Sequence, residues 1–126
     1  MERVTISSSL KFKEAIRFAV SELEKHGIRA LFPNLESEIR KEGVDLKFMK
    51  KLEREHFEAI DGSEALYVIC PDGYVGTLVS AEIGYAVAQG KPVLFSEEPE
   101  DLGLQAMASA YISLDELKRL RDFINQ

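Results

Sequence analysis

The residue with the clearest chemical potential is Glu82, in the segment SAEIGYAVAQGKPV (residues 80–93). The helical period of this segment predicts a helix over residues 80–89, which places Glu82 within about the first turn. The macrodipole favours an ionised carboxylate near a helix N-terminus, and a carboxylate nucleophile must be ionised. The alternative is that Glu82 only stabilises the start of its helix, by roughly 0.3 to 1 kcal/mol.

The second candidate is a polar run of Ser7, Ser8, Ser9 and Lys11, between the first predicted strand and the first predicted helix. A helix start offers unpaired N–H groups and a partial positive charge. Hydroxyl groups and a lysine beside it would complete a cradle for a phosphate or a sugar oxygen. The alternative is that one serine caps the helix and the others are filler, since no glycine pattern specifies a phosphate loop here.

The third candidate is the segment PDGYVGT (residues 71–77), which follows the most apolar predicted strand. Its two glycines, of which Gly76 is the second, allow the backbone to approach a ligand closely. The ring of Tyr74 could stack on a base or a sugar. The alternative is an ordinary turn after a strand, which proline, aspartate and glycine form by themselves.

The other titratable side chains are weaker candidates. Glu64 precedes the strand ALYVIC, so simple counting places it at the opposite end of that strand from the candidate site. His56 falls on the apolar face of its predicted helix and is interpreted as a packed or interface histidine, and Cys70 as a buried structural thiol. Two histidines and one cysteine without ligand spacing predict no metal site, and we expect no cofactor.

Alternating strands and helices must position these residues. Short β-rich runs occupy residues 4–7, 29–32, 65–70, 93–96 and 111–112, and segments of helical period occupy residues 12–25, 46–59, 80–89 and 114–124. This alternation predicts one α/β domain over residues 1–126, with a doubly wound, flavodoxin-like or Rossmann-like parallel sheet of about five strands. Ligands bind such sheets outside the carboxyl ends of the strands, where the three candidate segments fall.

Three local patterns complete this prediction. Ser113 followed by Glu116 has the spacing of a capping box at the start of the last helix. The least regular stretch, residues 33–45, is interpreted as a mobile loop beside the site. The lysine-rich segment KFMKKLER (residues 47–54) is flanked by glutamates at helical spacing, which indicates a solvated helix face with paired charges.

Composition excludes several classes of protein. A chain of 126 residues, 45% hydrophobic and 30% charged, fits one globular domain. It contains no apolar run near the roughly 20 residues that span a bilayer, and its first residues lack the apolar region of a signal peptide. We therefore expect a soluble, cytoplasmic protein without membrane partners. The net charge of −6 argues against nucleic-acid partners, because phosphate backbones attract basic surfaces.

Two segments, VTISSSLKF (residues 4–12) and EALYVICPDGYVGTLVSAEIGYAVAQGKPVLF (residues 64–95), together with a small-residue segment near the end, carry a family resemblance. The chain resembles the nucleoside 2-deoxyribosyltransferase family, including the 2'-deoxynucleoside 5'-monophosphate N-hydrolases. The resemblance implies that Glu82 is a nucleophile that attacks the anomeric carbon and forms a covalent glycosyl intermediate. It implies Asp72 or Glu64 as the assisting carboxyl group.

The resemblance also implies the binding partners. The substrate would be a nucleoside or nucleotide, with the serine run and Lys11 on the side of a 5'-phosphate. Tyr74, Gly76 and Ser80 fill the interval before the nucleophile and would contact the substrate. Family members are generally homo-oligomers, and the segment 104–111, with Met107 and Ser109, matches the region that would reach a neighbouring chain.

Two functions remain open from the sequence. The first is an enzyme that cleaves or transfers N-glycosidic bonds, which the retained Glu82 favours. The second is a nucleotide-binding or sensing module with the same fold and no turnover. It is favoured by Thr5, which stands where family members commonly carry a tyrosine. A flavodoxin-like carrier or a response regulator fits less well, because serines follow the first strand where a receiver needs acidic residues.

Overall fold

Five short strands form one parallel sheet in the part of the chain that the computed structural model describes, residues 2–33 and 45–124. They are β1 (Glu2–Ser7), β2 (Ile28–Leu31), β3 (Ala65–Val68), β4 (Val93–Phe95) and β5 (Ala110–Tyr111). Their order is β2-β1-β3-β4-β5, and every neighbouring pair is parallel. This is a flavodoxin-like order, and the predicted fold class is confirmed.

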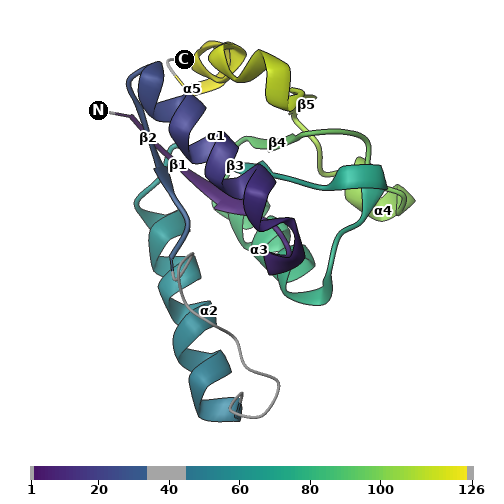
Figure 1. Ribbon diagram of the computed structural model, residues 1–126. Coiled ribbons are helices and arrows are strands. Elements are labelled where there is room, and N and C mark those ends of the chain that lie inside the picture. Colours follow the sequence, from purple (N-terminus) through teal and green to yellow (C-terminus); the bar gives the residue numbers. More distant parts are fainter. Residues whose placement is uncertain (1, 34–44, 125–126) are drawn as a thin grey trace.

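Helices cover both faces of the sheet (Figure 1). The longer ones are α1 (Lys13–Lys25), α2 (Leu46–Asp61) and α3 (Thr77–Ala88), and two short ones are α4 (Leu102–Gln105) and α5 (Arg121–Ile124). Three 3₁₀ helices are η1 (Leu10–Phe12), η2 (Pro71–Gly73) and η3 (Leu114–Leu120). Among the described residues, no helix is long and apolar enough to cross a membrane.

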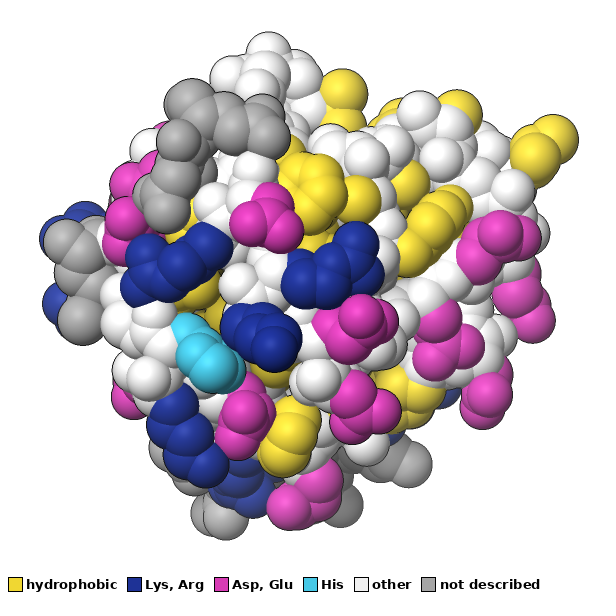
Figure 2. Space-filling model, turned by 90° about the horizontal axis from the view of Figure 1, so that it is seen from above, with side chains coloured by type: hydrophobic (Ala, Val, Ile, Leu, Met, Phe, Trp, Pro, Cys, Tyr) yellow, Lys and Arg dark blue, Asp and Glu magenta, His cyan; other side chains and the backbone are white. Residues whose placement is uncertain are grey.

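The core lies in two layers because the sheet is buried on both faces. On β3, Tyr67 and its alternate neighbours pack with residues of α1 and η3, whereas Leu66 and Val68 pack with residues of α2 and α3. A strand that buries both faces reads as a continuous apolar run, which explains the sequence ALYVIC. Figure 2 shows Lys and Arg side chains interspersed with Asp and Glu side chains on one outer face.

Strand β1 is different because one of its two buried faces is polar. Val4 and Ile6 belong to the apolar layer beneath α1, and the alternate residues Thr5 and Ser7 are fully buried as well. Successive side chains of a strand point to opposite faces, so Thr5 and Ser7 face α2 and α3. Thr5 Oγ1 lies 2.7 Å from Ser63 Oγ, which satisfies one of these two buried hydroxyl groups.

The third long helix begins earlier than predicted. The sequence predicted a start at residue 80, but α3 starts at Thr77 after an extended Gly76. Ser80 lies inside the helix, where its hydroxyl group donates to the carbonyl oxygen of Gly76 at 3.0 Å. Glu82 therefore lies in the second turn of α3 and not in the first, which weakens the macrodipole argument because that effect fades after one turn.

The C-terminal helix also differs from its prediction. Residues 114–120 form η3, which is interrupted at Glu116 (φ −125°), and the α-helical turn starts only at Arg121. The capping box is wrong: the Ser113 hydroxyl donates to the Glu116 carboxylate at 3.2 Å and makes no bond to the backbone. The predicted loop over residues 33–45 lies outside the described residues except at its two ends.

One buried hydrogen bond joins the centre of the sheet to the chain beyond β5. The hydroxyl group of Tyr67 donates to the carbonyl oxygen of Ile112 at 2.7 Å, and burial raises the pKa of Tyr67, so the phenol stays neutral. We expect Tyr67→Phe to lower the free energy of unfolding by about 1 to 3 kcal/mol, because it leaves a buried carbonyl without its donor. Urea denaturation measures this, with the half-exposed Tyr111→Phe as control. Equal stability of the two variants would contradict it.

Candidate functional site

A pocket of about 430 Å³ opens at the carboxyl ends of β1 and β3. The order of the sheet reverses between these two strands, which is where doubly wound sheets bind their ligands. Four segments line the pocket: the chain after β1, the chain after β2 with α2, the chain after β3, and α3. The lining residues are Ser8, Ser9, Leu10, Lys11, Phe32, Pro33, Met49, Leu52, Glu53, His56, Tyr74, Gly76, Thr77, Leu78, Val79 and Glu82.

Glu82 is a buried carboxyl group in the wall of this pocket. It is only 4% exposed, and its Oε1 accepts a hydrogen bond of 2.5 Å from the Ser7 hydroxyl. The same oxygen lies 3.4 Å from Nε2 of His56. The polar face of β1 and a side chain of α2 thus both meet the Glu82 carboxyl group at Oε1.

The pKa of Glu82 is raised from 4.5 to about 9. Burial is the largest cause, and the neighbouring carboxyl group of Glu53 adds to it, while the hydrogen bond from Ser7 acts in the opposite direction. The raised pKa contradicts the prediction that the helix start keeps Glu82 ionised. The desolvation of a buried carboxylate outweighs a macrodipole that is weak in the second turn.

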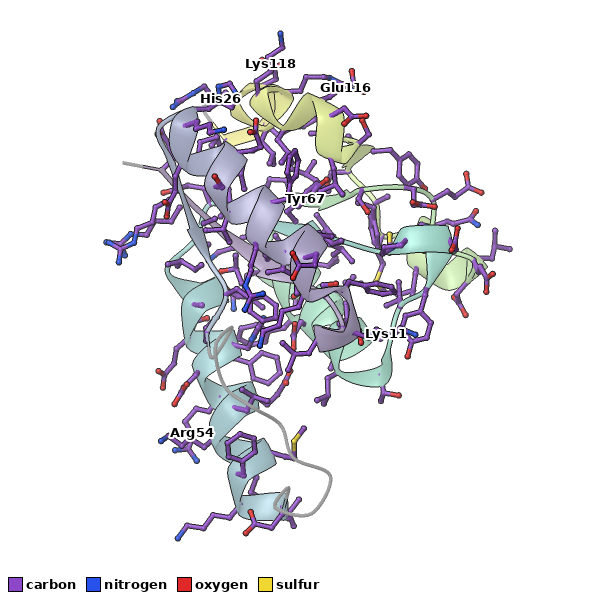
Figure 3. The ribbon with its side chains drawn as sticks, viewed as in Figure 1. Lys11, His26, Arg54, Tyr67, Glu116 and Lys118 are labelled. Atoms are coloured by element: carbon purple, nitrogen blue, oxygen red, sulfur yellow. The ribbon has the colours of Figure 1, made fainter. Side chains whose placement is uncertain are left out.

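Glu53 brings a second carboxyl group into the pocket, and sequence reasoning missed it. It lies on α2 one turn from both Met49 and His56, which also line the pocket. Its carboxyl group is in hydrogen-bond contact with that of Glu82. The solvated-face interpretation of residues 47–54 applies to Arg54, which is exposed (Figure 3), but is wrong for Glu53. The available signal was the spacing of Glu53 within the apolar stripe of this helix.

His56 is packed, as predicted, and also lines the pocket. It is 6% exposed, its Nε2 lies 3.1 Å from the carbonyl oxygen of Ile6, and its ring meets Phe32 edge-on at 5.2 Å. Since a carbonyl only accepts, Nε2 carries a proton and donates it. Burial lowers the pKa of His56, although the Ile6 carbonyl and the charge of Glu53 act to raise it. The imidazole is therefore a neutral donor beside Glu82.

The rim of the pocket carries one positive charge on an aromatic ring. Lys11 Nζ lies 3.4 Å from the ring centroid of Tyr74, which in turn meets Phe12 edge-on at 6.0 Å. Lys11 belongs to η1, beside the chain that leads into α3 (Figure 3). A cation held over a half-exposed aromatic ring is available to an anionic ligand, since an exposed cation–π contact contributes only about 0.5 to 1 kcal/mol.

The three serines of the predicted polar run, residues 7–9, make different contacts. Ser7 contacts Glu82, whereas Ser8 and Ser9 line the pocket nearer the rim. The Ser8 hydroxyl donates to the carbonyl oxygen of Ile69 at 3.0 Å. The Ser9 hydroxyl accepts from the backbone N–H of Lys11 at 3.4 Å and caps η1. Both serines retain hydroxyl lone pairs that a ligand in the pocket can use.

Five other predicted site residues do not line the pocket. Asp72 is exposed on η2 in a left-handed conformation (φ 58°), and Glu64 lies at the amino end of β3, where it accepts from the backbone N–H of Arg3. Ser80 is bonded inside α3. Ser109 accepts from the backbone N–H of Val93 at 3.0 Å, at the amino end of β4, and Met107 is partly exposed nearby in the chain. A role for segment 104–111 in a neighbouring chain stays a prediction.

The hydrogen bond from Ser7 can be tested without a ligand. We expect Ser7→Ala to raise the pKa of Glu82 further, because the ionised carboxylate loses the donor that stabilises it. Titration of the ¹³C-labelled glutamate carboxyl signals by NMR measures the shift, and Ser9→Ala serves as the control at the rim. A lower or unchanged pKa of Glu82 in Ser7→Ala would contradict this assignment of the bond.

Comparison with known proteins adds to this geometry. No family model matches the chain, and no curated protein matches it in sequence. A solved structure of a 2-deoxyribosyltransferase from Bacillus psychrosaccharolyticus superposes with a TM-score of 0.75 and 17% identity, over 96% of this chain and 91% of that one. This chain shares its fold. The resemblance seen in the sequence is thus confirmed at the level of the fold.

Two further solved structures are similar. A conserved protein from Enterococcus faecalis V583 has a TM-score of 0.62 and 17% identity, over 95% of this chain and 99% of that one. A 3-dehydroquinate dehydratase-like protein from Bifidobacterium longum has a TM-score of 0.51 and 10% identity, over 98% and 95% of the two chains. Since one arrangement of strands and helices hosts different chemistry, the function must be argued from the pocket.

Proposed function

We propose that the protein cleaves or transfers the N-glycosidic bond of a nucleoside or nucleotide, with Glu82 as the nucleophile. The observation that carries the proposal is the buried carboxyl group of Glu82, in contact with a second carboxyl group in the wall of the pocket. Glycoside cleavage through an oxocarbenium-like transition state is the chemistry that paired carboxyl groups perform. The shared fold of the 2-deoxyribosyltransferase makes a nucleoside the first substrate to test.

The contact between Glu82 and Glu53 favours a covalent mechanism. Inverting glycosidases keep their two carboxyl groups roughly 6.5 to 9.5 Å apart so that a water molecule fits between them, and retaining ones bring the groups closer. Two carboxyl groups in hydrogen-bond contact leave no such space. Glu82 would therefore attack the anomeric carbon itself, and the glycosyl group would then pass to water or to a second base.

Attack requires an ionised Glu82, and the pocket supports that form once a substrate is bound. The Ser7 hydroxyl donates directly to Oε1, and Nε2 of the neutral His56, which donates to the Ile6 carbonyl oxygen, lies 3.4 Å from the same carboxyl oxygen. Positive charge that develops on the sugar ring in the transition state would stabilise the carboxylate further, because water screens a buried carboxylate poorly. Ser7 is thus a positioning residue for Glu82.

The rim favours a nucleoside 5'-monophosphate as the substrate. Lys11 supplies the positive charge, Ser8 and Ser9 supply hydroxyl groups, and Tyr74 supplies a ring for a base or a sugar. We expect Lys11→Met to raise KM for the monophosphate about 10- to 100-fold, because a charge-assisted hydrogen bond contributes roughly 1.5 to 3 kcal/mol. KM for the unphosphorylated nucleoside should change less than about threefold by the same reasoning. Equal changes for both substrates would contradict a phosphate at this position.

A binding or sensing module is the second candidate. The raised pKa of Glu82 favours it, since a protonated carboxyl group is a hydrogen-bond donor and not a nucleophile. In that case the pocket would recognise a nucleotide and leave its glycosidic bond intact.

One experiment separates the two functions. The purified protein is incubated with deoxynucleosides, ribonucleosides and their 5'-monophosphates, with and without a second free base, and free base and new nucleosides are quantified by chromatography. Release of base supports the enzyme, and appearance of a new nucleoside identifies transfer as opposed to hydrolysis. Thermal stabilisation by a nucleotide without any release would reject the enzyme and leave the binding module.

A further inference from the structure

Glu53 lines the pocket together with Glu82, and the proposed function assigns it no step of the reaction. We propose that Glu53 is the general acid that protonates the departing base and afterwards the general base that activates the acceptor water. This inference rests on the proposed function and assigns the second half of its chemistry. It replaces Asp72 and Glu64, which the family resemblance suggested and which lie outside the pocket.

The carboxyl groups of Glu82 and Glu53 differ in the hydrogen bonds that they receive. Oε1 of Glu82 accepts from the Ser7 hydroxyl and faces Nε2 of His56. Oε1 of Glu53 is fully buried, and within the described residues no donor reaches it. An ionised carboxylate only accepts hydrogen bonds and needs donors to stabilise its charge. A protonated carboxyl group carries no charge and has an O–H donor of its own. The two carboxyl groups therefore share one proton, and Glu53 is the better donor of it to a departing base, because Ser7 stabilises the charge that is left on Glu82.

The other titratable groups that face Glu53 fit the role less well. His56, on the same helix, commits its Nε2 proton to the carbonyl oxygen of Ile6, and burial disfavours a second proton on the ring. Lys11 on η1 and Tyr74 after η2 lie together at the rim, engaged with each other. Glu82 on α3 is the nucleophile of the proposed function. Among the described residues that line the pocket, Glu53 is the acid in contact with the nucleophile.

The steps balance with one proton. An oxygen of the Glu82 carboxylate forms a bond to the anomeric carbon while the bond from that carbon to the base nitrogen breaks. The electron pair of the broken bond stays on the base, which takes the proton of Glu53. Water then attacks the anomeric carbon and gives a proton to the Glu53 carboxylate, as the bond to Glu82 breaks. The products are the free sugar and the free base, and both carboxyl groups return to their starting states.

Leaving groups of different basicity test this role. Wild type, Glu53→Gln and Glu58→Gln are assayed with a deoxynucleoside monophosphate and with 4-nitrophenyl 2-deoxyriboside, whose nitrophenolate departs without protonation. Glu58 is the matched control because it is an exposed glutamate on the same helix. We expect Glu53→Gln to lower kcat about 10²- to 10⁴-fold with the natural base, the range for loss of a general acid, and less than about tenfold for glycosylation by the nitrophenyl substrate.

The pH dependence gives a second readout of the same variant. With the natural base, the wild-type rate should fall on the alkaline side as the carboxyl pair loses its shared proton, and the nitrophenyl substrate should lack this limb. In Glu53→Gln the limb should be absent with both substrates. Equal losses with both substrates, or an unchanged rate with the natural base, would overturn the assignment of Glu53 while leaving Glu82 as nucleophile. No release from either substrate by wild type would instead refute the proposed function, and the role of Glu53 with it.

The shared proton can be observed without turnover. The infrared C=O stretch of a protonated carboxyl group should be present at pH 7 in wild type and in Glu58→Gln. Glu82→Gln should remove this band and Glu53→Gln should shift it, because both carboxyl groups take part in holding the proton. A band that is unchanged in Glu53→Gln would show that Glu53 does not share the proton and would overturn the proposal. Circular dichroism of each variant verifies that it is folded.

Discussion

Glu82→Gln should abolish base release while leaving the protein folded. Loss of a covalent nucleophile lowers kcat by several orders of magnitude, on the order of 10³ to 10⁶. The amide has nearly the same shape as the carboxyl group, and it can still accept from Ser7 through its oxygen. Single-turnover assays with the preferred nucleotide measure the loss, and binding of the same nucleotide should change by less than about tenfold, since the nucleophile acts mainly in the transition state.

Stability separates this result from simple misfolding. A buried carboxyl group that contacts another costs free energy, so the amide should melt at the same temperature as wild type or higher. Glu58→Gln, an exposed change of the same kind, should retain wild-type turnover and melting temperature. Turnover within a factor of about ten of wild type in Glu82→Gln would exclude a nucleophilic role, because that residual rate is far above what loss of a nucleophile allows.

The second large effect is a decrease of stability with rising pH. The pKa of Glu82 is about 9 in the folded protein and close to 4.5 when unfolded. Between these values the folded state holds a proton that the unfolded state has lost, so the free energy of unfolding falls as pH rises, by up to about 1.4 kcal/mol per pH unit. The full contribution is present below pH 4.5 and is lost as pH approaches 9.

The measurement must avoid the titration of His56. Its folded pKa is below the ordinary 6.5, so the unfolded state binds the proton first and stability falls as pH drops through that range, which is the opposite sign. Chemical denaturation between about pH 7 and 8.5 isolates the carboxyl pair, because the imidazole is then largely neutral in both states. Wild type should lose stability across this range, and Glu82→Gln should not. Parallel slopes for the two proteins would contradict a shared buried proton.

Much of the fold could be predicted because its determinants are local. The continuous apolar run of β3 indicates a strand covered on both faces, and Gly27 ends α1 with a positive φ of 76° that favours glycine. Strands alternating with helices then leave few topologies other than a parallel doubly wound sheet. The start of α3 was placed three residues late, because a threonine after Gly76 begins the helix and Ser80 bonds back inside it.

The site could be predicted from the sequence only in part, at residues next to the end of a predicted strand or the start of a predicted helix. Ser7 and Glu82 were both selected, yet their 2.5 Å hydrogen bond joins residues 75 positions apart, and no local pattern reports such a contact. Glu53 was assigned to a solvated face because its neighbours are charged, although Met49 and His56 at helical spacing share its side of α2. The sequence also predicted an ionised Glu82, whereas burial raises its pKa. This burial depends on which helix covers the pocket, and a sequence motif does not contain that information.

Trapping the glycosyl intermediate tests the central claim most directly. A 2-deoxy-2-fluoro-arabinofuranosyl nucleoside, as the 5'-monophosphate, slows formation and breakdown of such intermediates, since fluorine destabilises the oxocarbenium-like transition states. Digestion and tandem mass spectrometry of the treated protein would then locate the sugar. We expect one fluorosugar phosphate bound covalently to Glu82, one equivalent of free base released, and no adduct in Glu82→Gln. Turnover of the nucleotide with no adduct, or with the sugar on another residue, would contradict it.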